Sequence, residues 1–559
     1  MKPLFHDYLD VQGDFISYED FNKNFRLKKP VSFNFAFDVV DRYGKEDPDR
    51  TALVWTDPDG AERVFSFKQM MEASNRAACY FHSLGIRKGD AVMLILKRHH
   101  EFWPAIIALH KLGAVTVPAT HLLTAKDIVY RVNAADVKML VCTRQQSDIV
   151  TAVEEALPAC PGLRHKALVR TRREGWLDYD AGVANQPDVF EKPAGDAFAC
   201  DDDLMLLYFT SGTTGLPKMV AHNYYYPLGH IITAVYWQQT EDHGLHLTIS
   251  ETGWAKSVWG KLYGQWLGGC AVFAYDFDRF QAADILHVIS RYKVTSFCAP
   301  PTMYRYILQE PLEQYDLSSL QRCVVAGEPL NPDMAESWSR RMGIELREAF
   351  GQTELTVTLA TFPWMKVCPG SMGKPSPLFE VDLVDEDGQT CPTGVTGEIV
   401  CRTHHGPPMG MFMGYHNDPE MTLGVWYNNI YHTGDTAWRD EWGYYWYVGR
   451  TDDLIKSAGY RIGPFEVESA LLEHPAVLEA AVTGVPDEMR GQLVKATVVL
   501  KPGVERSEAL IKALQNHVKH MTAPYKYPRI IEFADSLPKT ISGKIRRTEL
   551  RGRDAAKQG

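Results

Sequence analysis

"YFTSGTTGLPKMV", Tyr208 to Val220, combines glycine, serine, threonine and one lysine directly after an apolar run. That run, "DLMLLYF" from Asp203 to Phe209, predicts a buried strand. Glycines let backbone N–H groups approach an anion closely, and hydroxyls and a lysine add donors and positive charge. The spacing does not fit the GxxxxGK[ST] pattern of a Walker A loop. The segment therefore predicts either a different kind of triphosphate-binding loop or a flexible surface loop. Its candidate phosphate-binding residues are Thr210, Ser211, Gly212, Thr213, Thr214, Gly215 and Lys218.

Upstream of this loop, helix and strand patterns alternate. Apolar residues at helical spacing predict helices over Phe65–Ile86 and Glu101–Ala114. Short apolar runs predict strands at Ala91–Lys97, Val115–Ala119 and Val137–Cys142. Such a βαβ rhythm is typical of a mainly parallel sheet covered by helices, so we expect an α/β fold.

Downstream, the pattern changes twice. From about Ser371, short strand-like pieces separated by Gly and Pro predict a small β-rich subdomain. After "GRTDD" (Gly449–Asp453), predicted helices at Pro464–Glu473 and Ser507–Met521 alternate with strands at 479–485, 495–500 and 529–534. We expect a large N-terminal domain, residues 1–451, and a small mobile α+β domain, residues 452–559.

Composition narrows the functional classes. The 559 residues are 45% hydrophobic and 23% charged, as in ordinary folded proteins. The formal net charge of -11 gives no overall attraction to nucleic acid or anionic membranes. The ten cysteines follow neither a zinc-site nor a disulfide spacing, and no apolar run approaches the ~18 residues of a membrane helix. We expect a cytoplasmic protein. Its assembly stays open, and a homodimer is one alternative.

Five further segments extend the argument. "TSGTTGLPK" closely resembles the phosphate loop of the adenylate-forming superfamily, which includes acyl- and aryl-CoA synthetases, firefly luciferase and peptide-synthetase adenylation domains. Other motifs of that superfamily follow in the same order. They are "AGEPL" (Ala326–Leu330), "EAFGQTE" (Glu348–Glu354), "YHTGD" (Tyr431–Asp435), "GRTDDLIKSAGYRIGPFEVE" (Gly449–Glu468) and "PKTISGKIRR" (Pro538–Arg547). "TAPYKYPR" (Thr522–Arg529) and "SAGYRIGPFEVE" are most similar to the medium-chain acyl-CoA synthetases.

The resemblance implies sites for ATP and Mg²⁺. Glu354 would be the Mg²⁺ ligand and Thr353 would touch a phosphate, whereas an isolated Glu is usually a solvated surface residue. Asp435 would accept both ribose hydroxyls, a task suited to a carboxylate, and Arg450 would reach the ribose or a phosphate. Phe350 stands where the family usually has Tyr, and its ring can still stack on adenine. The remaining nucleotide-binding candidates are Gly327, Glu328, Glu348, Gly351 and Gln352.

The resemblance also assigns roles within the C-terminal domain. The protonated ammonium of Lys544 would bridge the acid carboxylate and the α-phosphate of ATP. Asp452 would be the hinge about which this domain rotates. Rotation would withdraw Lys544 and bring in a path for CoA formed by Ala458, Gly459 and Tyr460. Arg490 and Lys519 are further CoA candidates; the alternative for both is a solvated surface position.

"ETGWAKSVWG" (Glu251–Gly260) lies where relatives place part of the acyl pocket. Trp254 matches the family, whereas Lys256 stands near a position that is usually apolar or small. Trp259 and Trp237 add bulk, and large rings shorten a cavity. We therefore expect a short-to-medium aliphatic acid, linear or branched. The alternatives are that these tryptophans are ordinary core residues and that Lys256 extends its stem past apolar surface.

The leading hypothesis is an AMP-forming acyl-CoA synthetase that uses ATP, Mg²⁺, CoA and a small carboxylic acid. The alternatives are a free-standing enzyme that loads a carrier-protein thiol, an aryl-CoA ligase, a luciferase-like oxidase and a non-enzymatic binding module. The ordered motifs argue against the binding module, and nothing in the sequence signals oxygen chemistry.

Overall fold

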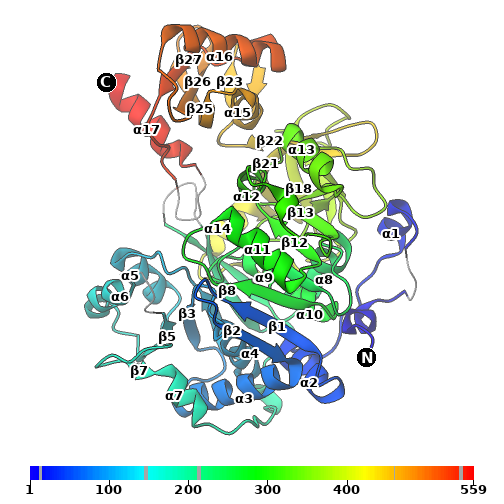
Figure 1. The fold of residues 1–559 in the computed structure, drawn as a ribbon, viewed down its shortest axis with the longest axis vertical. Helices are drawn as coiled ribbons and strands as arrows, with labels where there is room; N and C mark the ends of the chain where they lie inside the picture. Colours follow the sequence, from blue (N-terminus) through cyan, green and yellow to red (C-terminus); the bar gives the residue numbers. More distant parts are fainter. Residues whose placement is uncertain (12–14, 144–148, 211–215, 459, 540–544, 559) are drawn as a thin grey trace.

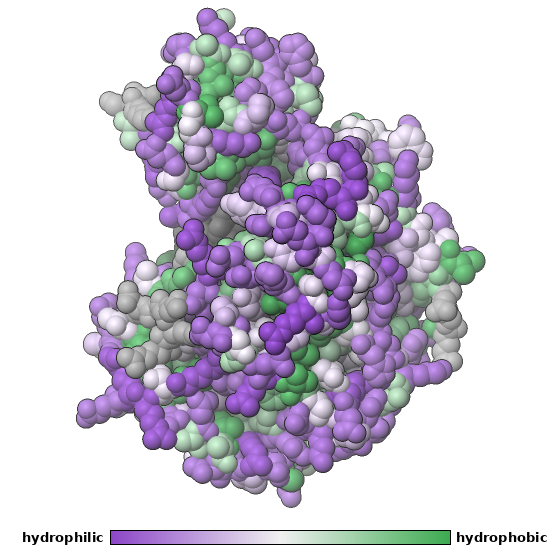
Figure 2. Space-filling view, in the orientation of Figure 1, coloured by the Kyte–Doolittle hydropathy of each residue, from purple (hydrophilic) through white to green (hydrophobic). Residues whose placement is uncertain are grey.

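The computed structural model describes residues 1–11, 15–143, 149–210, 216–458, 460–539 and 545–558, with the backbone alone at 557 and 558. These residues form a large body and a small C-terminal lobe (Figure 1). A narrowing of the surface separates the two lobes in Figure 2. Within the described ranges, no helix is both long and apolar enough to cross a bilayer.

A large mixed sheet extends through the body. Its strands, in spatial order, are β17 (Glu380–Val384), β18 (Gly397–Arg402), β21 (Ile430–Arg439), β22 (Tyr445–Arg450), β16 (Ser371–Pro375), β15 (Leu359–Ala360), β14 (Leu346–Phe350), β13 (Arg322–Ala326), β12 (Ser296–Ala299), β10 (Leu245–Thr248), β11 (Ala271–Tyr275), β1 (Thr51–Thr56) and β2 (Glu62–Ser66), with β20 (Trp426–Tyr427) beside β21. The run from β1 to β14 is parallel. The loops that follow β10, β13 and β14 therefore share one edge, which is where open α/β sheets bind ligands.

A second sheet contains the strands predicted in the first half. It runs β19 (Gly414–Tyr415), β9 (Lys218–Asn223), β8 (Leu204–Thr210), β4 (Val115–Pro118), β3 (Ala91–Ile95), β5 (Val137–Cys142), β6 (His165–Leu168) and β7 (Leu177–Asp178). The expected parallel order is confirmed from β8 to β7. β8 and β9 instead pair antiparallel, with Thr210 opposite Lys218, and so bring the two ends of the glycine-rich segment together.

The helices of the body are α1 (Tyr18–Asn24), α2 (Arg42–Glu46), α3 (Phe67–Ser83), α4 (Phe102–Leu112), α5 (Ala125–Ala134), α6 (Ile149–Ala156), α7 (Tyr179–Ala184), α8 (Tyr226–Ile231), α9 (Lys256–Gly260), α10 (Tyr263–Leu267), α11 (Ala282–Tyr292), α12 (Pro301–Ile307), α13 (Pro332–Met342) and α14 (Pro419–Val425). The two predicted helices are confirmed as α3 and α4. α3 begins two residues later than expected because Ser66 and Gln69 form a capping box. α4 ends at Leu112 and is capped by Gly113, whose positive φ of 76° suits glycine.

The β-rich region after Ser371 is not a separate sheet. β16 pairs with β15 on one side and with β22 on the other, so these strands continue the large sheet. The expected short strands are therefore present, and they extend the large sheet. Sequence spacing predicts these Gly-interrupted strands but does not show which edge they join.

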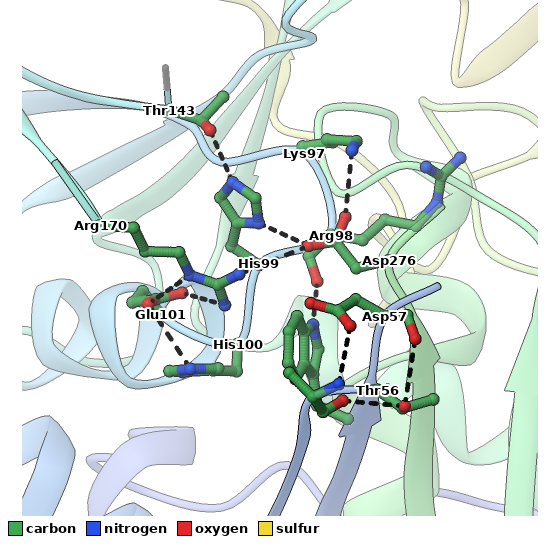
Figure 3. A network of polar contacts seen from close by, with 12 residues as sticks. Thr56, Asp57, Lys97, Arg98, His99, His100, Glu101, Thr143, Arg170 and Asp276 are labelled. Carbon is green, nitrogen blue, oxygen red and sulfur yellow. Dashed lines mark hydrogen bonds and ion pairs between the residues drawn. The ribbon is translucent and has the colours of Figure 1, made fainter. Parts of the chain in front are cut away.

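A buried polar network connects the two sheets at the ends of β3, β5 and β11 (Figure 3). His99 lies at its centre, with Nδ1 2.5 Å from Asp276 Oδ2 and Nε2 2.6 Å from Thr143 Oγ1. Lys97 Nζ lies 3.5 Å from Asp276 Oδ1, and all three of Lys97, His99 and Asp276 are buried. Because isolated buried charges are costly, the pairing fixes the two sheets relative to each other.

The C-terminal lobe is the expected α+β unit. Its sheet runs β24 (Tyr460–Ile462), β23 (Ile455–Ser457), β26 (Gly491–Leu500) and β25 (Val477–Asp487), with β27 (Ile530–Phe533) beside β26. Its helices are α15 (Pro464–Glu473), α16 (Glu508–Met521) and α17 (Arg547–Gln558). α15 and α16 share an apolar core with the sheet. The position of the domain boundary, at Asp452, stays a prediction.

Candidate active site

Three of the predicted nucleotide residues meet at one buried carboxylate. Asp435, on β21, is only 6% exposed and lies opposite Arg450 of β22. Gln352, just after β14, donates from Nε2 to Asp435 Oδ2 at 2.5 Å, and Arg450 Nη1 lies 3.5 Å from the same oxygen. Tyr447 donates to Asp435 Oδ1 at 3.2 Å. A carboxylate fixed by several donors is well suited to accept hydroxyl groups of a ligand.

The electrostatics of Arg450 follow from this pairing. Burial lowers its pKa, but the charges of Asp435 and Asp452 outweigh burial and raise it above the ordinary value. Its guanidinium also packs close to Gly434, where a Cβ would come within 2.8 Å of Nη2. With φ at +70°, Gly434 is a position that favours glycine on both grounds. Arg450 therefore remains a cation beside Asp435.

The predicted metal ligand is held by a residue that the motifs did not indicate. Tyr415, on β19, donates to Glu354 Oε1 at 2.9 Å. Lys218, the last residue of the predicted phosphate loop, places Nζ 4.9 Å from the centre of the Tyr415 ring. Thr353 accepts a hydrogen bond on its backbone oxygen from His222, over 2.8 Å. Lys218 and Glu354 therefore converge on one tyrosine.

The adenine motifs lie after β13 and β14, at the shared edge of the large sheet. Phe350 ends β14 and is partly buried, whereas Glu328 is exposed and accepts from Thr302 at 2.7 Å. Glu348 points into the core, where Oε1 accepts from Leu330 N at 3.3 Å. Burial raises the pKa of Glu348 to about 8. The side chain of Glu348 thus belongs to the core. The residues that follow Glu348 in its motif lie at the shared edge of the large sheet.

The predicted acyl-pocket residues meet the nucleotide motifs. A Cβ on Gly351 would come within 2.4 Å of the Trp259 ring, so only glycine fits there. Trp237 is fully buried, donates to Arg347 O at 3.1 Å and lies edge-on to Trp259 at 6.4 Å. Trp237 therefore packs behind Trp259, which favours its interpretation as a core residue.

The other two pocket candidates lie on the same loop and helix. Trp254 is half-buried in the loop before α9, and Lys256 begins α9. Lys256 Nζ donates to Ala326 O, at the end of β13. It also lies close to Gly327, where a Cβ would be 3.3 Å away. The Lys256 side chain thus connects the acyl-pocket loop to the adenine motif.

The hinge and CoA candidates lie in, or at the start of, the C-terminal lobe. Asp452 Oδ1 is 3.6 Å from Arg450 Nε. Ala458, with a positive φ of 50°, donates from its backbone N to Arg490 O at 2.8 Å. Tyr460 is half-exposed and stacks on Tyr525 at 4.0 Å. Lys519 Nζ lies 4.1 Å from the Tyr527 ring. The structure thus places Ala458 next to Arg490. Lys519 lies beside Tyr527, whereas Tyr460 lies beside Tyr525.

Several predicted residues lie outside the described ranges. They are Ser211, Gly212, Thr213, Thr214, Gly215, Gly459 and Lys544. The residues that flank Lys544 are described: Lys539 and Ile545 form an antiparallel bridge, and Arg546 N donates to Pro538 O at 2.9 Å.

The residue chemistry fits the magnesium ion that the resemblance implies. Mg²⁺ is usually held by one or two carboxylates together with substrate phosphates. In the part of the chain that the structure describes, no group of three or more His, Cys, Asp or Glu side chains could hold a metal. A single carboxylate, Glu354, close to Lys218 through Tyr415 fits a metal that arrives with the ATP phosphates.

Two known protein-family patterns match the chain. The AMP-binding enzyme family matches residues 40–416, and the AMP-binding enzyme C-terminal domain matches residues 466–544. The chain belongs to the AMP-binding enzyme family. This AMP-binding enzyme is 40% identical to the mouse acyl-coenzyme A synthetase ACSM3, mitochondrial, over 99% of the chain and 96% of the relative. It is 39% identical to human acyl-coenzyme A synthetase ACSM4, mitochondrial, over 96% of the chain and 94% of the relative.

Solved structures resemble the enzyme along nearly its whole length. The anthranilate CoA ligase AuaEII in complex with anthranoyl-AMP aligns with a TM-score of 0.86 and 31% identity, covering 95% of this chain and 99% of that one. A benzoate CoA ligase from Burkholderia xenovorans LB400 aligns with a TM-score of 0.79 and 28% identity, covering 93% and 100%. These likenesses confirm the expected fold, a large N-terminal domain with a smaller C-terminal one.

Proposed function

We infer that this protein is an AMP-forming acyl-CoA synthetase, which converts a carboxylic acid, ATP and CoA to acyl-CoA, AMP and pyrophosphate. The observation that carries this inference is the 40% identity to acyl-coenzyme A synthetases over nearly the whole chain. The convergence of Gln352 and Arg450 on the buried carboxylate of Asp435 supports it, because the three residues come from separate motifs.

In the first half-reaction, a carboxylate oxygen of the acid attacks the α-phosphorus of ATP, and pyrophosphate leaves. Asp435 would hold the ribose hydroxyls, Phe350 would stack on adenine, and Lys218 with the Thr210–Gly215 segment would bind the phosphates. Glu354 would hold Mg²⁺, which supplies positive charge to the triphosphate. Lys544 would place an ammonium between the two reacting anions, with Thr353 touching a phosphate.

In the second half-reaction, the CoA thiolate attacks the acyl carbonyl carbon and AMP leaves. We propose that the domain after Asp452 rotates about this residue between the two steps, as hinge-linked domains do. Ala458, Gly459 and Tyr460 would then line the path of the thiol, with Arg490 and Lys519 as further CoA contacts. The backbone hydrogen bond from Ala458 to Arg490 supports a single site for these two residues.

We propose a short-to-medium aliphatic acid, linear or branched, as substrate. Trp259 supports this, since its ring lies in contact distance of Gly351 and leaves little length beside the nucleotide motif. An aromatic acid is the second candidate, because the solved relatives include an anthranilate and a benzoate CoA ligase. Loading of a carrier-protein thiol remains an alternative for the acceptor.

Product analysis tests the proposal. The purified protein is incubated with ATP, Mg²⁺ and a panel of aliphatic and aromatic acids, with and without CoA. We expect acid-dependent pyrophosphate release and, with CoA, AMP and acyl-CoA in equal amounts. Formation of ADP, or AMP formation that needs a carrier protein in place of CoA, would contradict the assignment.

Location and assembly stay predictions. The cytoplasmic location expected from the sequence is not confirmed, because the relatives named above are mitochondrial proteins. Cell fractionation would decide between the two compartments, and light scattering would decide between a monomer and the proposed homodimer.

A further inference from the structure

Tyr415 connects two groups that come from different motifs. Its hydroxyl donates to Glu354 Oε1 at 2.9 Å, and its ring faces Lys218 Nζ at 4.9 Å. The side chain is 6% exposed, so both contacts are largely shielded from water. We propose that Tyr415 is a positioning residue for the metal–triphosphate site: its hydroxyl orients the Glu354 carboxylate and its ring orients the Lys218 ammonium.

The backbone around Tyr415 holds it in this place. β19 pairs antiparallel with β9, so Tyr415 lies opposite Val220, two residues beyond Lys218. The backbone N of Tyr415 donates to Thr422 Oγ1 at 2.9 Å. Phe412 N donates to the backbone oxygen of Glu354 at 2.8 Å. The segment from Phe412 to Tyr415 therefore fixes both the backbone and the side chain of Glu354.

Two physical effects give this arrangement its consequence. A hydrogen bond to one oxygen of a metal-binding carboxylate fixes its orientation, and loss of such partners commonly weakens metal binding by about 10–100-fold. A cation above an aromatic face is attracted by the ring, which restricts the lysine to one region. The hydroxyl should therefore determine how much the metal contributes to ATP binding, and the ring should determine how much Lys218 contributes.

Two substitutions separate these effects. Tyr415→Phe removes the hydroxyl and keeps the ring, whereas Tyr415→Leu removes both. Tyr444→Phe is the matched control, since it removes a tyrosine hydroxyl that donates elsewhere, to Lys366 O at 2.8 Å. The inference rests on the proposed function, because it assumes that Glu354 holds the metal of a bound Mg-ATP.

The test measures ATP binding by calorimetry, without acid or CoA, in the presence of Mg²⁺ and after its chelation. The quantity of interest is the factor by which Mg²⁺ strengthens ATP binding. In Tyr415→Phe we expect this factor to fall about ten-fold while the affinity for metal-free ATP stays within about two-fold of the wild type. Tyr415→Leu should lose metal-free ATP affinity as well, and Tyr444→Phe should match the wild type.

A second probe reports on the metal itself. The paramagnetic resonance spectrum of Mn²⁺ in the enzyme–ATP complex should change in Tyr415→Phe and stay unchanged in Tyr444→Phe. The inference would be overturned if Mg²⁺ strengthened ATP binding in Tyr415→Phe as much as in the wild type and the Mn²⁺ spectrum were unaltered. This holds whatever effect Glu354→Gln has on the two measurements. The proposed function is judged separately, by acid-dependent pyrophosphate release from the wild type.

Discussion

At the scale of single residues, the proposed acyl pocket depends on Trp259. Trp259→Ala would remove a ring that lies against Gly351 and edge-on to Trp237. We expect kcat/KM for bulky acids to rise relative to short acids by roughly ten-fold or more, because a fixed ring excludes groups that are too large. A panel of linear, branched and aromatic acids measures this ratio. Trp442→Ala, at a tryptophan that is 69% exposed, is the control, and an unaltered acid profile in Trp259→Ala would contradict the pocket assignment.

Glu348 makes a pH-dependent contribution to stability. Burial raises its pKa to about 8 from the ordinary value of 4.5, so between these values the folded chain binds a proton that the unfolded chain has lost. Stability should therefore fall as pH rises from 5 to 8, by at most about 1.4 kcal/mol per pH unit. Glu348→Gln should flatten this slope in denaturant unfolding of the nucleotide-free protein.

The control for this slope is Glu345→Gln, which changes a largely exposed carboxylate near the start of the same strand. It should retain the wild-type slope. If Glu348→Gln and the wild type lost stability equally between pH 5 and pH 8, Glu348 would not be the titrating group.

The sequence indicated some residues of the site and not others. Asp435, Gln352 and Arg450 were named from separate motifs, and the structure brings them together. The sequence did not indicate Tyr415, because it lies 61 residues from Glu354 and in none of the quoted motifs. An aromatic residue after a glycine, four residues before a helix that begins with Pro, is too common a pattern to indicate a role. For Trp237, apolar character fits both a pocket and a core, and only its burial behind Trp259 favours the core.

At the scale of elements, the network in Figure 3 joins the two sheets of the body. Asp276→Asn would remove the negative charge that His99 and Lys97 contact, while Lys97 keeps Asp278 as a carboxylate partner. Losing a hydrogen bond to a charged group typically costs about 1.5–3 kcal/mol. We expect the free energy of unfolding to fall by about 2 kcal/mol, measured by denaturant titration.

The matched control for that prediction is Asp316→Asn, which breaks an exposed pair with Lys293 and should have little effect. A loss in Asp276→Asn as small as that of the control would show that the network contributes little to the junction. The sequence could not predict this network, because its members follow strands whose neighbours are set only by the tertiary fold.

Local patterns predicted most elements but not how they join. α15 begins and ends where its apolar periodicity predicts, at Pro464 and Glu473. The strands after Ser371 were also expected, yet their union with the large sheet depends on the pairing of β16 with β15, which no local pattern encodes. Helix ends differ from the predicted ends where a capping residue acts, as Ser66 does at the start of α3.

At the scale of the whole molecule, the last helix of the C-terminal lobe is paired with Asp453, the residue after the proposed hinge. Arg547 and Arg551 of α17 reach Asp453 at 3.4 and 2.7 Å. The segment that contains Lys544 directly precedes α17 in the sequence, so the proposed rotation would carry both. If the lobe rotates at Asp452, Lys544 must move with it, and the two half-reactions should need different residues.

The most direct measurement of that claim compares the half-reactions in Lys544→Ala. Acid-dependent ATP–pyrophosphate exchange reports adenylate formation, and conversion of supplied acyl-adenylate to acyl-CoA reports thioester formation. The account predicts that Lys544→Ala loses exchange by several orders of magnitude while it retains thioester formation near the wild-type rate. Equal loss of both half-reactions, or exchange at the wild-type rate, would contradict it.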